Sequence, residues 1–127
     1  MNEEKRKFDL EDRLIDFAIL IIGISENLTN SKAGNHISGQ IVRSGTSPAL
    51  HYGEAQSAES RADFIHKLKI LLKELRETLV GLKIILKVPL SINLPVINIG
   101  IDECNQLISI FVKSIETAKK NLVNDAK

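Results

Sequence analysis

The feature that most constrains the fold is a long stretch of helical periodicity in the second half of the chain. From Ser60 to Lys87, apolar residues recur at alternating intervals of four and three. An α-helix rises about 1.5 Å per residue, so a helix of this length is roughly 40 Å long. Such a helix is too long for a compact mixed fold of 127 residues but is typical of a helical bundle. Its apolar stripe contains Phe64, Leu68, Leu71, Leu75, Leu82 and Ile85.

Three more segments carry helical periodicity, over residues 9–28, 32–57 and 98–122. We predict Asp9 as the N-cap of the first helix, because acidic residues follow it in the first turn, where the helix dipole favours them. Ser60 with Asp63 resembles a capping box at the start of the helix over 60–87. Four long amphipathic segments with short connections predict an all-α fold. We expect an antiparallel up-down-up-down four-helix bundle, with a single domain over 1–127.

The segment over 32–57 contains a proline that disfavours a regular helix. Pro48 removes an internal hydrogen bond and disfavours helical backbone at Ser47. We therefore expect a kink or a brief break near 44–48. In the alternative, Thr46 or Ser47 caps a fresh helix with Pro48 in its first turn.

The helical period stops at residues 88–97. Apolar residues alternate there with polar residues and prolines, and Pro89 and Pro95 cannot continue a helix. We expect an extended connector that is apolar on one side. It either lies across the end of the bundle or docks on a neighbouring subunit.

Composition excludes several classes of protein. The 17 Lys and Arg nearly balance the 16 Asp and Glu, and a net charge of +1 excludes a uniformly basic nucleic-acid-binding protein. A single cysteine, Cys104, excludes an internal disulfide and a multi-cysteine metal site. The charge-free apolar run from Phe17 to Ile24 is far shorter than the roughly 20 residues that span a bilayer. No signal peptide is visible, so we expect a cytoplasmic protein that does not contact membranes.

No arrangement of residues is typical of catalysis, and we expect no enzymatic activity, no metal and no cofactor. The three histidines, His36, His51 and His66, are far apart in the sequence. His51 has Glu54 three residues later, but a single pair of this kind does not make a metal site. Cys104 lies on the apolar stripe of the last helix, which predicts an inert core thiol.

Positive charge is concentrated in the helix over 60–87. Residues 61–87 carry seven Lys or Arg and three acidic residues. On a monomer, such a stripe is commonly a solvated helix face. In a ring of identical subunits it is multiplied by the subunit number and becomes a belt that can hold a phosphate backbone without reading sequence. The residues that share one face of the helix are Lys69, Lys73, Arg76, Lys83 and Lys87.

The helix over 9–28 has more apolar surface than one core contact requires. From Phe17 onward, Ile19, Leu20 and Ile22 add apolar side chains to its other faces. A helix that is apolar all round needs neighbours on more than one side. We therefore expect contact with another subunit, with deeper burial inside the monomer as the alternative.

Three stretches carry a family resemblance: RSGTSP at 43–48, GEAQSAESRADFIHK at 53–67 and KELRET at 73–78. Together they resemble the bacterial four helix bundle protein family. That family includes proteins encoded by intervening sequences in large-subunit ribosomal RNA genes, and accessory variability determinant proteins of diversity-generating retroelements are similar relatives. The resemblance extends over nearly the whole chain, roughly from Asp9 to Leu122.

The resemblance implies a homopentamer of antiparallel bundles with no known enzymatic activity. It also implies nucleic-acid binding through basic residues and association with a reverse transcriptase, as in the retroelement relatives. Where relatives often carry an aromatic pair after the Arg-Glu-Thr run, this chain has Val80 and Gly81, which removes a stacking surface. An intervening-sequence-type or orphan member of the family is the better fit.

Two hypotheses for function follow. In the first, an oligomeric bundle binds RNA or DNA through the five cations of the basic stripe, with Arg43 and Arg61 as additions. In the second, the protein is a scaffold for another protein, such as a reverse transcriptase or an RNA-processing enzyme. The docking surface would then be the small-residue face of 32–57 or the connector from Val88 to Val96.

Overall fold

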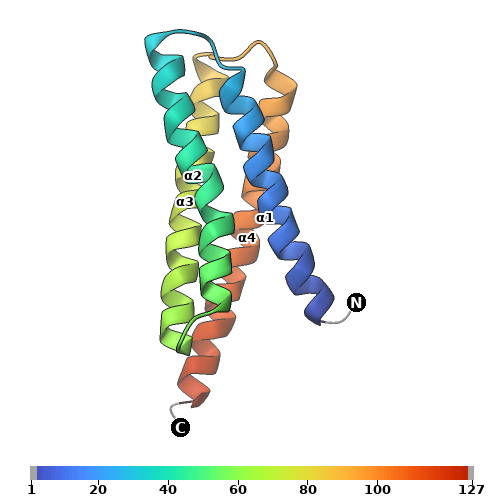
Figure 1. The fold of residues 1–127 in the computed structure, drawn as a ribbon, viewed down its shortest axis with the longest axis vertical. Coiled ribbons are helices and arrows are strands. Elements are labelled where there is room, and N and C mark those ends of the chain that lie inside the picture. The colour runs from blue at the N-terminus through green and yellow to red at the C-terminus, as the bar shows by residue number, and fades with distance from the viewer. Residues whose placement is uncertain (1–2, 126–127) are drawn as a thin grey trace.

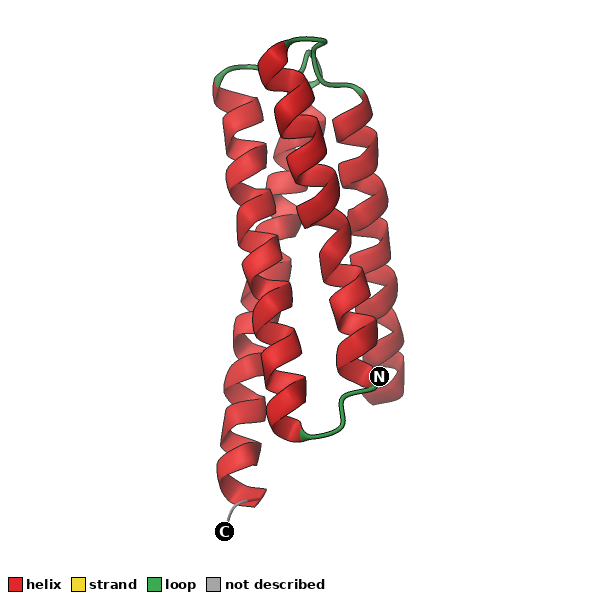
Figure 2. Ribbon diagram, turned by 60° about the vertical axis from the view of Figure 1, so that its left-hand side comes forward, coloured by secondary structure: helices red, strands yellow, loops and turns green. Residues whose placement is uncertain are grey.

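The computed structural model describes residues 3–125, with side chains described from residue 10 onward. Four helices, α1 (Glu3–Glu26), α2 (Lys32–Gln56), α3 (Arg61–Lys87) and α4 (Leu94–Asp125), run alternately up and down (Figure 1). Short loops join them, and no strand occurs among the described residues (Figure 2). The predicted all-α, antiparallel four-helix bundle is confirmed. No helix within 3–125 is long and apolar enough to span a membrane.

The core is built from one face of each of the four helices. Phe17 on α1, Leu75 on α3 and Phe111 on α4 are fully buried. The ring of Tyr52 on α2 meets Phe111 edge to face, with ring centroids 6.0 Å apart. The largest fully buried side chains are Phe17, Phe111, Leu14, Ile21, Ile41, Leu68, Leu71, Leu75, Leu82, Ile85, Ile97 and Leu107.

The first helix begins earlier than predicted. α1 starts at Glu3, so Asp9 lies inside the helix and the prediction that it is the N-cap is wrong. The charged residues that precede Asp9 include good helix formers, which allow the helix to extend toward the N-terminus. At its other end α1 stops at Glu26, two residues before the predicted end at Leu28.

The second helix continues through Pro48 without a break. Ser31 is its N-cap, and the Ser31 Oγ accepts a hydrogen bond from the Gly34 amide at 3.0 Å. Just before the proline, the hydroxyls of Thr46 and Ser47 donate to main-chain carbonyls of the preceding turn, at 2.7 and 2.6 Å. Both residues lie within the one helix, so the alternative of a fresh helix capped by Thr46 or Ser47 is wrong.

The third helix begins where the sequence indicates. The Ser60 Oγ accepts a hydrogen bond from the Asp63 amide at 3.0 Å, which confirms Ser60 as the N-cap. The helix ends at Lys87, as predicted.

The connector is shorter than predicted, because α4 begins at Leu94 and not near residue 98. The Asn93 Oδ1 accepts a hydrogen bond from the Val96 amide at 3.3 Å and so caps the helix, and Pro95 occupies the first turn, where it needs no hydrogen-bond partner. Residues 88–93 lie at the same end of the bundle as the α1–α2 loop, and the Leu90 carbonyl accepts from the Thr29 amide at 2.8 Å (Figure 1). The connector is not apolar on one side: Leu90 is buried, whereas Ile92 is 99% exposed.

The four seams between neighbouring helices are not equally close. α2 packs along both α1 and α3, whereas α1 contacts α4 over less of its length and leans away from it toward the N-terminus (Figure 1). An ion pair joins the Arg13 Nη2 on α1 to the Glu103 Oε1 on α4 at 2.7 Å. The backbones of α1 and α3 do not approach each other in the described chain, so these helices occupy opposite corners of the bundle.

Part of the apolar surface of α1 stays exposed among the residues whose side chains are described. Leu20 packs against the core, as the monomer-burial alternative expects. Ile15, Ile19 and Ile22 are 43%, 62% and 40% exposed, and their spacing places them on one outward face of α1. The expectation of surplus apolar surface is therefore correct for Ile19 and Ile22.

Candidate nucleic-acid interface

The outward face of α3 carries the basic stripe predicted from the sequence. Its cationic side chains all belong to exposed residues, and none forms an ion pair with another residue whose side chain is described. The stripe faces away from the core because its positions fall between the buried residues of α3. Its members are Lys69, Lys73, Arg76, Lys83 and Lys87.

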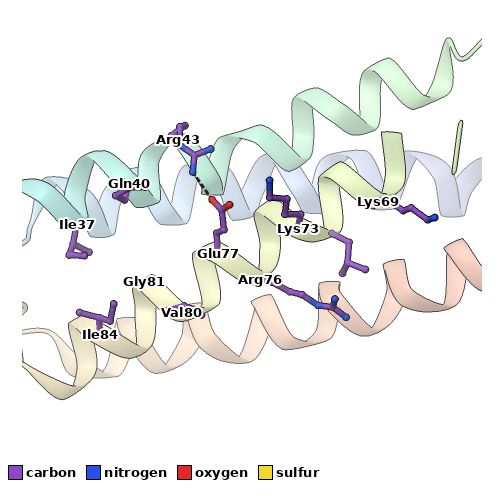
Figure 3. Close-up of a pocket in the computed structure, with 11 residues that line it drawn as sticks. Ile37, Gln40, Arg43, Lys69, Lys73, Arg76, Glu77, Val80, Gly81 and Ile84 are labelled. Carbon is purple, nitrogen blue, oxygen red and sulfur yellow. Dashed lines mark hydrogen bonds and ion pairs between the residues drawn. The ribbon is translucent and has the colours of Figure 1, made fainter. Parts of the chain in front are cut away.

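A shallow groove of about 850 Å³ lies over the middle of this face. Lys69, Lys73 and Arg76 line it, whereas Lys83 and Lys87 lie outside it, farther along the helix. In Figure 3 Lys73 points toward the α2 side of α3, and Arg76 points toward the α4 side. Because these side chains diverge, the arrangement suits an extended anion with several charges better than one small ion.

The groove also has an apolar part that sequence patterns did not indicate. Val80 and Ile84 on α3 line it beside Ile37 and Gln40 from α2 (Figure 3). Val80 is 58% exposed. The α2 residues could not be identified from the sequence, because their place in the groove depends on how α2 and α3 align. This part of the face has no aromatic ring on which a base could stack.

Arg43 belongs to the groove but is already paired with carboxylates of the same chain. Its Nη1 lies 2.9 Å from the Glu74 Oε2, and its Nη2 donates to Glu77 (Figure 3). The hydrogen bond to Glu77, together with the charge of Glu74, raises the pKa of Arg43. The structure therefore places Arg43 as a link between α2 and α3, so it is not an unpaired cation.

Arg61 lies away from the groove, at the beginning of α3. Its Nε donates to the Asp125 carboxylate near the end of α4. Like Arg43, it is paired within the chain, so the structure does not place it with the five unpaired cations of the stripe.

The pair His51 and Glu54 has a third member that the sequence did not reveal. The Glu54 Oε2 lies 3.5 Å from the His51 Nδ1 and 3.4 Å from the Lys67 Nζ. The Lys67 ammonium, more than His51, lowers the pKa of Glu54. Among the described residues, no three His, Cys, Asp or Glu lie close enough together to hold a metal ion.

Cys104 is buried in the core, and its Sγ donates to the Leu75 carbonyl at 3.2 Å. Burial, with a smaller effect of the Glu103 charge, raises the pKa of the thiol to about 12. In the unfolded chain the thiol ionises near pH 8.5. The folded state therefore keeps a proton that the unfolded state releases, and this group lowers stability as the pH rises above about 8.5.

We expect Cys104 of the folded protein to react very slowly with iodoacetamide at pH 8, because only the thiolate is nucleophilic. In urea the same thiol should react at the rate of a model peptide. Mass spectrometry of timed samples measures both rates. Rapid, complete labelling of the native protein would contradict a buried, protonated thiol.

Comparison with known proteins relates the chain to solved structures. No family model and no curated protein matches the chain. A solved structure from Bacteroides thetaiotaomicron VPI-5482, described as a protein with unknown function from the S23 ribosomal protein family, is similar, with 32% sequence identity and a TM-score of 0.76. The match covers 84% of this chain and 97% of that one. At this identity, and over nearly the whole length of that relative, the chain belongs to the S23 ribosomal protein family.

Proposed function

We propose that this protein is a non-enzymatic, oligomeric bundle that binds RNA or DNA without sequence preference through the outward face of α3. The observation that supports the proposal is the stripe of five exposed cations, none of which is paired with a described carboxylate. Arg43 and Arg61, which are paired, are not part of the proposed surface.

The dimensions of the stripe suit a polyanion. From Lys69 to Lys87 the helix rises roughly 27 Å, at about 1.5 Å per residue. One nucleic-acid strand places a phosphate about every 3.4 Å in duplex form, so several phosphates lie within reach of the stripe. Contacts with phosphates fix position without reading bases, and the groove offers no aromatic stacking platform. The expected binding is therefore sensitive to salt and tolerant of sequence.

The resemblance to intervening-sequence-encoded proteins supports the same proposal. Membership of the S23 ribosomal protein family is consistent with an intervening-sequence-type protein. We propose on that resemblance that the protein assembles into homopentamers in the cytoplasm.

A direct test reverses two charges of the stripe. The variant Lys73→Glu/Arg76→Glu should bind a fluorescent single-stranded oligonucleotide about tenfold or more weakly than the wild type at low salt. Fluorescence anisotropy at two salt concentrations measures this affinity and its salt dependence.

The matched control is Lys113→Glu/Lys120→Glu, which changes the net charge equally on the exposed face of α4. Its affinity for the oligonucleotide should be within about threefold of the wild-type affinity, because this control keeps all the phosphate contacts of the basic stripe. Equal losses in the two variants, or no binding by the wild type at low salt, would refute the proposal.

A scaffold for another protein is the second candidate, favoured by the exposure of Ile92. This residue is 99% exposed at the connector, beside Val88 at 58%. Leu90, in contrast, is buried and cannot contact a partner. An apolar docking surface of this kind is weakly screened by salt. If this apolar surface is the functional one, charge reversal on α3 leaves the binding of the partner protein unchanged.

A further inference from the structure

The outward face of α1 carries an acidic stripe with regular spacing. Its members recur at intervals of four, three, four and three residues, so they lie along one face of the helix. All are exposed, and none of the acidic members pairs with a described basic residue. This α1 stripe consists of Asp12, Asp16, Ile19, Gly23 and Glu26.

The basic stripe of α3 has the same spacing and the complementary side chains. When the two stripes are aligned from their N-terminal ends, each residue of the α1 stripe lies opposite one residue of α3. These α3 residues are, in order, Lys69, Lys73, Arg76, Val80 and Lys83. Each of the three carboxylates then faces a lysine. Ile19 faces the long side chain of Arg76, whose methylene groups can cover it. Gly23 faces Val80, so the exposed valine side chain lies opposite a residue that has no side chain.

The packing inside the bundle places the two stripes at the same height. Ile21 on α1 lies against Gly45 on α2, where an added Cβ would be 2.6 Å from the Ile21 Cγ2. The Thr78 Oγ1 on α3 donates to the Ser44 Oγ, next to Gly45, at 2.8 Å. Ile21 and Thr78 are therefore at about the same height in the bundle. Asp12 precedes Ile21 by the same number of residues as Lys69 precedes Thr78, so Asp12 and Lys69 are also at about the same height.

The topology allows two copies to bring these stripes together. α1 and α3 run in the same direction and occupy opposite corners of the bundle (Figure 1). Two copies that stand side by side at equal height therefore place α1 of one parallel to α3 of the next. We propose that the acidic stripe of α1 is the docking surface for the basic stripe of α3 in a second copy of this chain.

Gly23 leaves room for close contact at this surface. A Cβ added at Gly23 would meet no atom within 4 Å, so the isolated bundle has no steric reason for glycine there. Glycine inside a helix is about 1 kcal/mol less favourable than alanine. A neighbouring helix that seats Val80 at this point gives the glycine a role, because it leaves room for the valine. Ile15 and Ile22, both part-exposed, flank the same contact.

Because the two faces differ, the contact is heterologous, and successive copies close into a ring or extend into a filament. The interface rests on the oligomerisation proposed above and can form whether or not nucleic acid is present. It uses four of the five cations of the basic stripe, Lys69, Lys73, Arg76 and Lys83, and so covers most of that surface.

A charge-swap experiment tests the interface in the absence of nucleic acid. Asp12→Lys/Asp16→Lys and Lys69→Asp/Lys73→Asp each place like charges opposite each other, and each should sediment as a single protomer where the wild type sediments as an assembly. A chain that carries all four changes should recover the assembly. Circular dichroism checks that each variant keeps its helices.

Two outcomes would overturn the proposal: wild-type protein that sediments as a protomer, or folded double variants that assemble as the wild type does. Failure of the four-change chain to reassemble would equally overturn it. The control Lys113→Asp/Lys120→Asp, on the exposed face of α4, should assemble normally.

A second variant pair tests the contact without a change of charge. Gly23→Phe should block the approach of Val80 and yield protomers. Gly53→Phe is the matched control, since Gly53 is also a helical glycine at which a Cβ meets nothing within 4 Å. If both variants assemble, or both dissociate, Gly23 does not lie at the interface.

Discussion

Replacing Gly45 with valine is expected to lower the free energy of unfolding by about 3 kcal/mol. An ideal Cβ at this position would lie 2.6 Å from the Ile21 Cγ2 and 2.9 Å from both the Cβ and the Cγ1 of Ile21. Ile21 is fully buried and its branched Cβ sits close to its own backbone, so it cannot swing aside. The cost arises because α1 and α2 must move apart to admit the new side chain.

The matched control is Gly53→Val in the same helix, where the added side chain meets open space. Its free energy of unfolding should change by less than about 0.5 kcal/mol, since valine is slightly better than glycine in a helix. Urea titrations followed by circular dichroism, at one protein concentration, measure both values. Ile21→Ala and Gly45→Val should together cost less than the sum of their separate losses only if these two side chains collide. Equal midpoints for Gly45→Val and the wild type would mean that α1 and α2 are not packed this closely.

The helices could be predicted because each one carries an apolar stripe that the bundle buries. Leu68, Leu75 and Leu82, which recur every seven residues, are all at most 1% exposed. The errors lie at the prolines. Pro48 does not break α2, because it is buried in the bundle, where packing against the neighbouring helices offsets the hydrogen bond that proline cannot donate. Pro95 does not delay α4, because Asn93 caps the helix one turn earlier.

The basic face of α3 was visible in the sequence, since the spacing of its charges is a property of one helix. The pairing of Arg43 with Glu74 and Glu77 was not visible, because it depends on the alignment of α2 with α3. The α1 stripe shows the same limit. Its spacing can be read from the sequence, but its match to α3 requires the common height that Ile21, Gly45 and Thr78 establish.

Together, the two proposals change the expected effect of assembly on the exposure of the basic stripe. From the sequence alone, a ring is expected to multiply the stripe into a charged belt. If α1 of one copy docks on α3 of the next, assembly instead covers Lys69, Lys73, Arg76 and Lys83. The carboxylates of Asp12, Asp16 and Glu26 then take the places that phosphates would occupy. Nucleic acid and a second protein copy then compete for one surface.

This competition predicts that an excess of a single-stranded oligonucleotide of about thirty nucleotides converts the assembly into smaller, nucleic-acid-bound species at low salt. Linkage requires the reverse effect as well, so the apparent affinity for the oligonucleotide should weaken as protein concentration rises. Sedimentation velocity with absorbance at two wavelengths follows protein and nucleic acid separately.

The uncharged variants provide the control for this prediction. At a concentration where the wild type is assembled, Gly23→Phe should bind the oligonucleotide more tightly than the wild type, because its α3 stripe is not covered, and Gly53→Phe should match the wild type. Neither change alters the charge, so a difference between them reports access to the stripe and not attraction to it. If the oligonucleotide instead adds its mass to an intact assembly and Gly23→Phe gains no affinity, the phosphates bind elsewhere, and the α1 stripe and the nucleic acid do not share α3.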